Sequence, residues 1–204
     1  MRTDFNPHEL TSRDFYRLLT AVVVPRPIAW VSSTSPEGVD NLAPHSFFTV
    51  ASVSPPVIAF TSVGAKDTLR NITTTGEFVV NLASAGLQAE VNATGINFAP
   101  DVSEFDEAGL TRETSKTVNV PRVAESPVSL ECKLHSTLPV GNCFLVLGEV
   151  THAVVASDVL RGTHPEIGLL EPLSRLGLDE WGTTNSLGEL RRIPVTDWPG
   201  NVER

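Results

Sequence analysis

A strict alternation of apolar and polar residues in the stretch PVSLECKLHS, residues 127–136, constrains the fold of this chain more than any other feature. Its central residues place apolar side chains at even positions and polar ones at odd positions. Because successive side chains of a strand point to opposite faces, the pattern predicts a strand with its apolar side chains on one face and its polar side chains on the other. The stretch NCFLVLGEVTHAVV, residues 142–155, predicts its antiparallel partner across a turn centred near Pro139 to Gly141.

The remaining sequence also favours strands over helices. Six segments have the composition of strands bounded by turn residues: 27–34, 39–52, 56–62, 77–83, 127–136 and 142–155. Short helices are expected at 66–72 and 84–93. Because strands and helices do not alternate regularly, the best architecture is a closed or nearly closed antiparallel barrel with helices on its flanks.

A further short helix is expected near the N-terminus, and it has two candidate starts. Asn6 followed by Pro7 fits a cap and a first helical residue. Thr11 or Ser12 offers a second start, directly before the apolar stripe of the helix. The residues alone leave both starts open.

The length of 204 residues favours one domain over residues 1–204, with a barrel core at about 20–155 and a C-terminal extension at 156–204. Residues 93–126 form a long connection rich in Gly, Pro and acidic residues, and a connection of that length is usually functional or mobile. Trp198 is isolated near the polar end of the extension.

The charge balance restricts the partners of the chain. Fifteen basic residues stand against 24 acidic ones, a formal net charge of −9. We therefore expect neither a nucleic acid nor an anionic membrane as a partner, because both attract basic patches. The sequence offers no signal peptide and no run of 18 apolar residues, which favours a cytoplasmic protein.

The two cysteines flank the predicted turn. A turn centred near Pro139 to Gly141 sets Cys143 opposite about His135, and not opposite Cys132. Cytoplasmic proteins also rarely keep disulfides. We therefore expect two free thiols.

Several enzyme classes lack their sequence signals. The chain has no dinucleotide-binding G-x-G, no phosphate-binding G-x-x-x-x-G-K loop and no G-x-S-x-G nucleophile elbow. Its five histidines and two cysteines show no metal-ligand spacing, so no metal site is expected.

The segment TSVGAKDTLRNI combines the elements of a phosphate site. Thr61 and Ser62 end a predicted strand, and Lys66, Asp67 and Thr68 open a predicted helix. Free N–H groups at a helix start, with a lysine and hydroxyls nearby, suit a phosphate. The alternative is that Asp67 or Thr68 only caps the helix, while Lys66 is a solvated surface residue.

The stretch NLAPHSFF breaks its own strand pattern at Pro44. Asn41, Ser46 and the exposed backbone groups beside this proline can hydrogen-bond the edge of a heteroaromatic ring, because Pro44 prevents regular ladder pairing. The alternative is a bulged edge strand, in which Phe47 and Phe48 alternate between the core and a partner surface.

Seven blocks of the sequence together resemble the flavin reductase-like domain family. They are PRPIAWVSS, NLAPHSFF, SPPVIAF, KDTLRNI, GEFVVNL, DEAGLT and SPVSLECKL, from about Val22 to Val154, with a weaker echo at PLSRLG. The family includes flavoredoxins and the reductase components of two-component monooxygenases. The resemblance implies a mainly β fold: an FMN-binding split β-barrel, antiparallel and Greek-key-like, with short flanking helices.

The resemblance also implies where FMN binds. The flavin ring is expected along the N-x-A-P-x-S segment and the strand before it, and the phosphate at the Lys-Asp-Thr segment. The implied residues are Trp30, Ser32, Ser33, Asn41, Ala43, Pro44, His45, Ser46, Thr61, Ser62, Lys66, Asp67 and Thr68. The 93–126 connection is expected to help cover the site. After RLG, where many relatives continue with glycine and tyrosine, this chain has Leu178 and then Trp181.

The implied activity is an NAD(P)H:flavin oxidoreductase, in which a nicotinamide passes hydride to bound FMN. The cofactor carries this chemistry, so no catalytic side chain is named. Two rivals are a flavoredoxin-like FMN electron carrier and a non-catalytic flavin-binding module. The family typically forms homodimers, and an oxygenase or electron-transfer protein is an expected partner. In so acidic a chain, the local cations Lys66, Arg26 and Arg70 are the candidates for holding anionic NAD(P)H.

Overall fold

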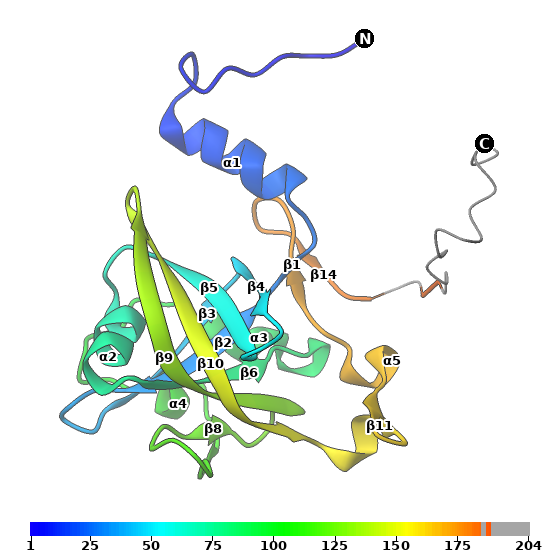
Figure 1. Ribbon diagram of the computed structural model, residues 1–204. Coiled ribbons are helices and arrows are strands. Elements are labelled where there is room, and N and C mark those ends of the chain that lie inside the picture. Colours follow the sequence, from blue (N-terminus) through cyan, green and yellow to red (C-terminus); the bar gives the residue numbers. More distant parts are fainter. Residues whose placement is uncertain (185–186, 189–204) are drawn as a thin grey trace.

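The computed structural model describes residues 1–184 and 187–188, and its centre is a seven-stranded antiparallel sheet (Figure 1). In spatial order the strands are β3 (Asp40–His45), β2 (Ala29–Thr34), β6 (Glu77–Leu82), β9 (Val128–Val140), β10 (Cys143–Val155), β5 (Val57–Val63) and β4 (Phe48–Ser52). All six expected strand segments therefore form strands, and the fold is mainly β as predicted.

The two edges of this sheet are neighbours in the chain. β3 and β4 are its outermost strands, yet only Ser46 and Phe47 separate them. The sheet therefore has to curl until its edges approach each other. The Phe47 carbonyl accepts a hydrogen bond from the Thr61 N–H at 2.9 Å, but β3 and β4 form no ladder in the described part of the chain. The result is a split barrel.

The inner face of the barrel forms the main core. The alternation predicted for β9 holds on its apolar face, where Cys132 is buried among apolar residues of the other strands. The polar face is covered as well, because Ser129 and Glu131 are also buried. The buried members of this cluster are Ala29, Val31, Ile58, Phe60, Leu69, Ile72, Phe78, Val80, Cys132 and Val146. The β10 residue Gly148 leaves room for the Phe78 ring, since a Cβ placed there would lie 2.2 Å from Cζ of that ring.

The predicted register of the β9–β10 hairpin is wrong. The turn is formed by Gly141 and Asn142, and Cys143 pairs with Val140 and not with His135. β9 continues through Pro139 because it no longer pairs with β6 beyond Lys133. A proline on such a free edge breaks no second ladder. Gly141 has a φ of +59°, the conformation that a two-residue hairpin turn requires. Both cysteines are nevertheless free, as predicted.

The helices lie outside the barrel. α1 (Ser12–Val22) is capped by Thr11, whose side chain accepts from the Asp14 N–H, so the second candidate start is the correct one. α2 (Asp67–Thr75) and α3 (Gln88–Ala93), the latter preceded by η1 (Ala85–Leu87), confirm the two other predicted helices. Figure 1 shows α1 standing apart from the sheet, beside the segment that carries β14. No helix in the described residues is long and apolar enough to cross a membrane.

The 93–126 connection has structure of its own and is anchored to the barrel. It contains α4 (Glu104–Glu107), β7 (Arg112–Glu113) and β8 (Arg122–Val123). The fully buried Glu131 of β9 accepts hydrogen bonds from the backbone N–H groups of Lys116 and Thr117 and pairs with Arg122 at 3.2 Å. These contacts hold the connection against the sheet.

The remaining short elements follow or flank the barrel. They are β1 (Arg26–Pro27), η2 (Ser157–Val159), β11 (Leu160–Arg161), β12 (His164–Pro165), α5 (Ile167–Leu170), β13 (Ser174–Arg175) and β14 (Trp181–Gly182). β1, β13 and β14 form a small sheet that returns the C-terminal segment to the start of the barrel. Trp198 lies outside the described residues.

Candidate functional site

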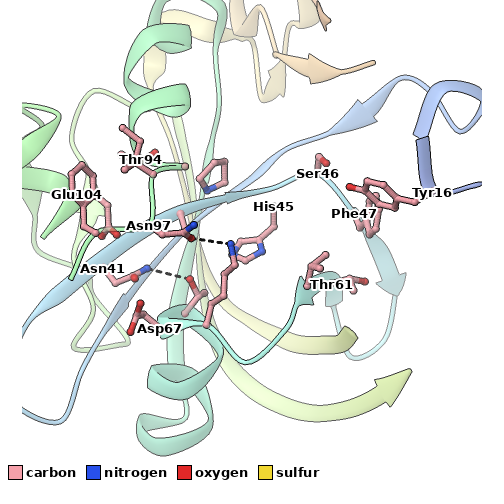
Figure 2. A pocket seen from close by; sticks show the side chains of 18 residues that line it. Tyr16, Asn41, His45, Ser46, Phe47, Thr61, Asp67, Thr94, Asn97 and Glu104 are labelled. Carbon is pink, nitrogen blue, oxygen red and sulfur yellow. Dashed lines mark hydrogen bonds between the residues drawn. The ribbon is translucent and has the colours of Figure 1, made fainter. Parts of the chain in front are cut away.

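A cleft opens at the split of the barrel, where β3 passes into β4 (Figure 2). Its walls come from the β3–β4 junction, the end of β5 with the start of α2, the loop after α3, and single residues of α1 and α4. The lining residues are Tyr16, Asn41, Ala43, Pro44, His45, Ser46, Phe47, Thr61, Val63, Lys66, Asp67, Thr68, Thr94, Gly95, Ile96, Asn97, Phe98 and Glu104. The split thus brings together segments far apart in the sequence.

Nine of the thirteen predicted site residues line this cleft. They are Asn41, Ala43, Pro44, His45, Ser46, Thr61, Lys66, Asp67 and Thr68. The other four, Trp30, Ser32, Ser33 and Ser62, are fully buried and do not line it.

Two of these four have structural partners close to the cleft. The indole N–H of Trp30 donates to Oγ1 of Thr94 at 2.9 Å, and so holds a residue of the cleft wall. The Ser62 hydroxyl donates to the Gly64 carbonyl at 2.9 Å and fixes the turn before α2. These two hydrogen bonds stabilise the wall of the cleft, although neither side chain lines it.

The start of α2 lies at the cleft, together with the ammonium group of Lys66. No described side chain caps this helix, which excludes the alternative that Asp67 or Thr68 serves as its cap. Asp67 instead pairs with Arg70, and the Thr68 hydroxyl accepts from Asn41 Nδ2 at 3.2 Å. The exposed Lys66 donates from Nζ to Oδ1 of Asn97 at 3.1 Å (Figure 2). A helix start with free N–H groups and a lysine is a favourable place for a phosphate.

The outer edge of β3 presents backbone groups at the cleft. The Leu42 N–H donates to Oε2 of Glu104 at 2.9 Å, away from β2. Because alternate residues of a strand direct their backbone groups to the same edge, the Pro44 carbonyl also lies on the free edge. Pro44 has no N–H, so no further strand can pair regularly there.

His45 lies buried between the cleft and the core. Its ring packs on Phe60 with centroids 4.7 Å apart. Burial lowers the pKa of His45 to about 4, while the Thr61 backbone acts in the opposite direction and Lys66 lowers it further. The imidazole is therefore neutral at pH 7, and its Nε2 is buried without a hydrogen-bond partner in the described structure.

Sequence reasoning did not find every residue of the cleft. Tyr16 reaches it from α1, where it packs near Phe47 with ring centroids 6.4 Å apart. Residues 94–98 and Glu104 belong to the 93–126 connection, which was expected to cover the site. The connection could be identified by its length, but not the particular residues that reach the cleft.

The predicted cations are not all near the cleft. Arg26 is buried and donates to the carbonyls of Thr20 and Leu176. Arg70 is bound to Asp67. Of the basic side chains, Lys66 alone lines the cleft among the described residues.

The fold and the cleft define a split-barrel protein of the flavin-reductase type. A model of the flavin reductase like domain matches residues 21–170, and the chain belongs to this family. This finding confirms the resemblance drawn from the seven sequence blocks.

Three similar proteins illustrate the relationship. Nitrilotriacetate monooxygenase component B from Bacillus cereus is 35% identical, with a TM-score of 0.88 over 95% of this chain and 99% of that chain. The 2-nitrobenzoate 2-nitroreductase NbaA of Pseudomonas fluorescens is 29% identical, with a TM-score of 0.89 over 98% of this chain and 100% of that chain. An uncharacterised protein of Halalkalibacterium halodurans is 40% identical over 203 residues, which cover 94% of this chain and 97% of the relative.

Proposed function

We propose that this protein binds FMN in the cleft at the barrel split and acts as an NAD(P)H:flavin oxidoreductase. The observation that carries the proposal is the convergence of two different features on one cleft: the uncapped start of α2 with Lys66, and the proline-broken edge of β3. The first suits a phosphate and the second suits the edge of a flat heteroaromatic ring. FMN carries both groups.

The phosphate is assigned to Lys66, Thr68 and the first N–H groups of α2. The present partner of the Lys66 amine is the neutral amide oxygen of Asn97. A dianionic phosphate is a stronger acceptor for an ammonium group than an amide oxygen is. The residues present therefore fit this end of FMN.

The ring is assigned to the β3 edge and the loop after α3. Pro44 and Ile96 supply apolar surface, and the Pro44 carbonyl and the Ser46 hydroxyl supply polar groups. The indole of Trp30 holds Thr94 in this wall from behind.

When bound, the flavin supplies the redox chemistry by accepting hydride from the nicotinamide. The chain contributes binding, orientation and exclusion of water. His45 is neutral at pH 7 because of its burial, and burial also raises the pKa of the Cys132 thiol. Neither residue is assigned a role as acid or nucleophile, and we name no catalytic side chain.

The similarity to a monooxygenase component B supports an oxygenase as the consumer of reduced flavin. We further propose a homodimer in the cytoplasm. The apolar residues Val22 and Val23 at the end of α1, and Val50 and Val53 near β4, are exposed in the single chain and offer surface for a second copy.

Anaerobic titration of the FMN-loaded protein with NADH and NADPH tests the proposed activity. The expected result is bleaching of the flavin's visible absorption band by at least one of the two. Bleaching only by a reduced ferredoxin-type protein would identify an electron carrier instead. Absence of bleaching by any of these reductants would leave a flavin-binding module.

A further inference from the structure

Glu104 lies between two cavities. It lines the cleft described above and also a neighbouring cavity of about 450 Å³, which we call the outer cavity. Asn41 and Asp67 are the other residues shared by the two. The outer cavity continues past the start of α2, where Arg70 and Asn71 line it. Because Asp67 lines both spaces, a ligand that extends beyond the proposed phosphate position can reach the outer cavity.

The carboxylate of Glu104 is buried without a cation. Glu104 is 7% exposed, and Oε2 accepts from the Leu42 N–H at 2.9 Å. No Lys, Arg or His pairs with it among the described residues. Burial raises the pKa of Glu104, backbone N–H groups oppose that change, and the neighbouring carboxylate of Asp67 raises it further. A buried carboxylate without a countercharge is costly, so its position between two cavities calls for an explanation.

The outer cavity is unfavourable for a second phosphate, because acidic side chains outnumber basic ones in its lining. Among the described residues, Lys66 is the one Lys or Arg that lines the cleft. Within the described part of the chain, the outer cavity is lined by one arginine, Arg70, which pairs with Asp67, and by four carboxylates: Glu37, Asp67, Asp101 and Glu104. An anion that entered between Asn41 and Glu104 would meet the buried carboxylate of Glu104. The carboxylates of Glu37 and Asp101 are exposed, so solvent screens them and Glu104 contributes most of the repulsion.

We propose that Glu104 restricts the site to flavins that carry a single phosphate, by repelling the second phosphate of a flavin adenine dinucleotide. The inference rests on the proposed FMN site and names its specificity-determining residue. Glu104 acts on the choice of ligand, and it takes no part in the redox step.

Dissociation constants of FMN, FAD and riboflavin test the proposal on the flavin-free protein. They are measured by flavin fluorescence for the wild type, Glu104→Gln and Glu107→Gln. Glutamine keeps an oxygen for the Leu42 N–H and removes the charge. Glu107 is an exposed residue of the same helix, so its substitution is a matched control for the loss of one negative charge.

We expect the wild type to bind FMN at least about tenfold more tightly than FAD, and Glu104→Gln to reduce that ratio by roughly tenfold. Riboflavin affinity should change little in Glu104→Gln, and Glu107→Gln should behave as the wild type. Equal affinity of the wild type for FMN and FAD overturns the proposal without any variant. An unchanged ratio in a folded Glu104→Gln protein also overturns it, while the FMN site itself survives. Absence of binding of all three flavins to the wild type overturns the FMN site and this inference together.

Discussion

The amine of Lys66 lies 3.1 Å from Oδ1 of Asn97, and this contact joins the start of α2 to the loop that follows α3. Both residues line the cleft, and both are exposed. The amide oxygen of Asn97 is a neutral acceptor, which a phosphate oxygen can replace. Substitution of Lys66 is therefore the most direct test of the proposed phosphate site.

Replacing Lys66 by alanine should weaken FMN binding by about one to two orders of magnitude. The substitution removes one charge-assisted contact to a dianion, and such contacts contribute roughly 1.5–3 kcal/mol. Riboflavin, which lacks the phosphate, should bind the wild type and Lys66→Ala almost equally. Dissociation constants for both ligands and both proteins separate the phosphate contact from general damage to the fold.

Lys133→Ala is the matched control, because Lys133 is an exposed lysine of β9 outside the cleft. It should leave both affinities unchanged. Equal losses of FMN and riboflavin binding in Lys66→Ala would indicate misfolding. No loss for either ligand would remove Lys66 from the phosphate site.

Gly148→Ala should lower the free energy of unfolding by about 1–3 kcal/mol, the usual effect of overpacking a core. Its Cβ would lie 2.2 Å from Cζ and 2.8 Å from Cε1 of the Phe78 ring, which is fully buried and has no free space to move into. Urea denaturation measures the change. Gly86→Ala is the control, since a Cβ at Gly86 meets nothing within 4 Å. A Gly148→Ala protein as stable as the control would contradict the close packing of β10 against β6.

His45 should make the protein less stable in acid. Its pKa of about 4 in the folded state is below the usual value of 6.5, so the unfolded chain binds this proton more readily. Stability therefore falls as the pH drops from about 6.5 to 4, by up to about 3 kcal/mol from this residue.

The variant His45→Phe removes the titrating group and keeps a ring against Phe60. Its free energy of unfolding should fall less than that of the wild type between pH 7 and pH 4.5, because the carboxylates of the two proteins titrate alike. Urea denaturation at several pH values measures both curves. Parallel curves would show that His45 is not buried in its neutral form.

The strands were predictable because their signal is local. The alternation from Val128 and the apolar runs of the other segments each depend on a few adjacent residues, and all six form strands. The hairpin register was not predictable in the same way. It depends on where β6 stops pairing with β9, which decides whether Pro139 can remain in a strand, and that is a property of the assembled sheet.

The site was predictable in part for the same reason. The β3 edge and the start of α2 carry compact sequence motifs, and both face the cleft. Trp30 shows the limit of a motif, because it belongs to one of the blocks that resemble the family but does not line the cleft, and contacts the wall residue Thr94 instead. Tyr16 and Glu104 are the reverse case, because both line the cleft and neither belongs to a motif that predicted the site. They reach the cleft only through the placement of α1 and α4, for which the sequence offers no local signal.

The central claim is that the cleft at the barrel split binds FMN, and titration of the flavin-free protein with FMN tests it most directly. The visible absorption of the flavin should shift on binding and the protein's own fluorescence should fall, with both changes saturating at about one FMN per chain. The Lys66→Ala protein should reach the same endpoint at higher FMN concentration. A wild-type protein that leaves the spectrum of added FMN unchanged, with no saturable signal, would contradict the claim.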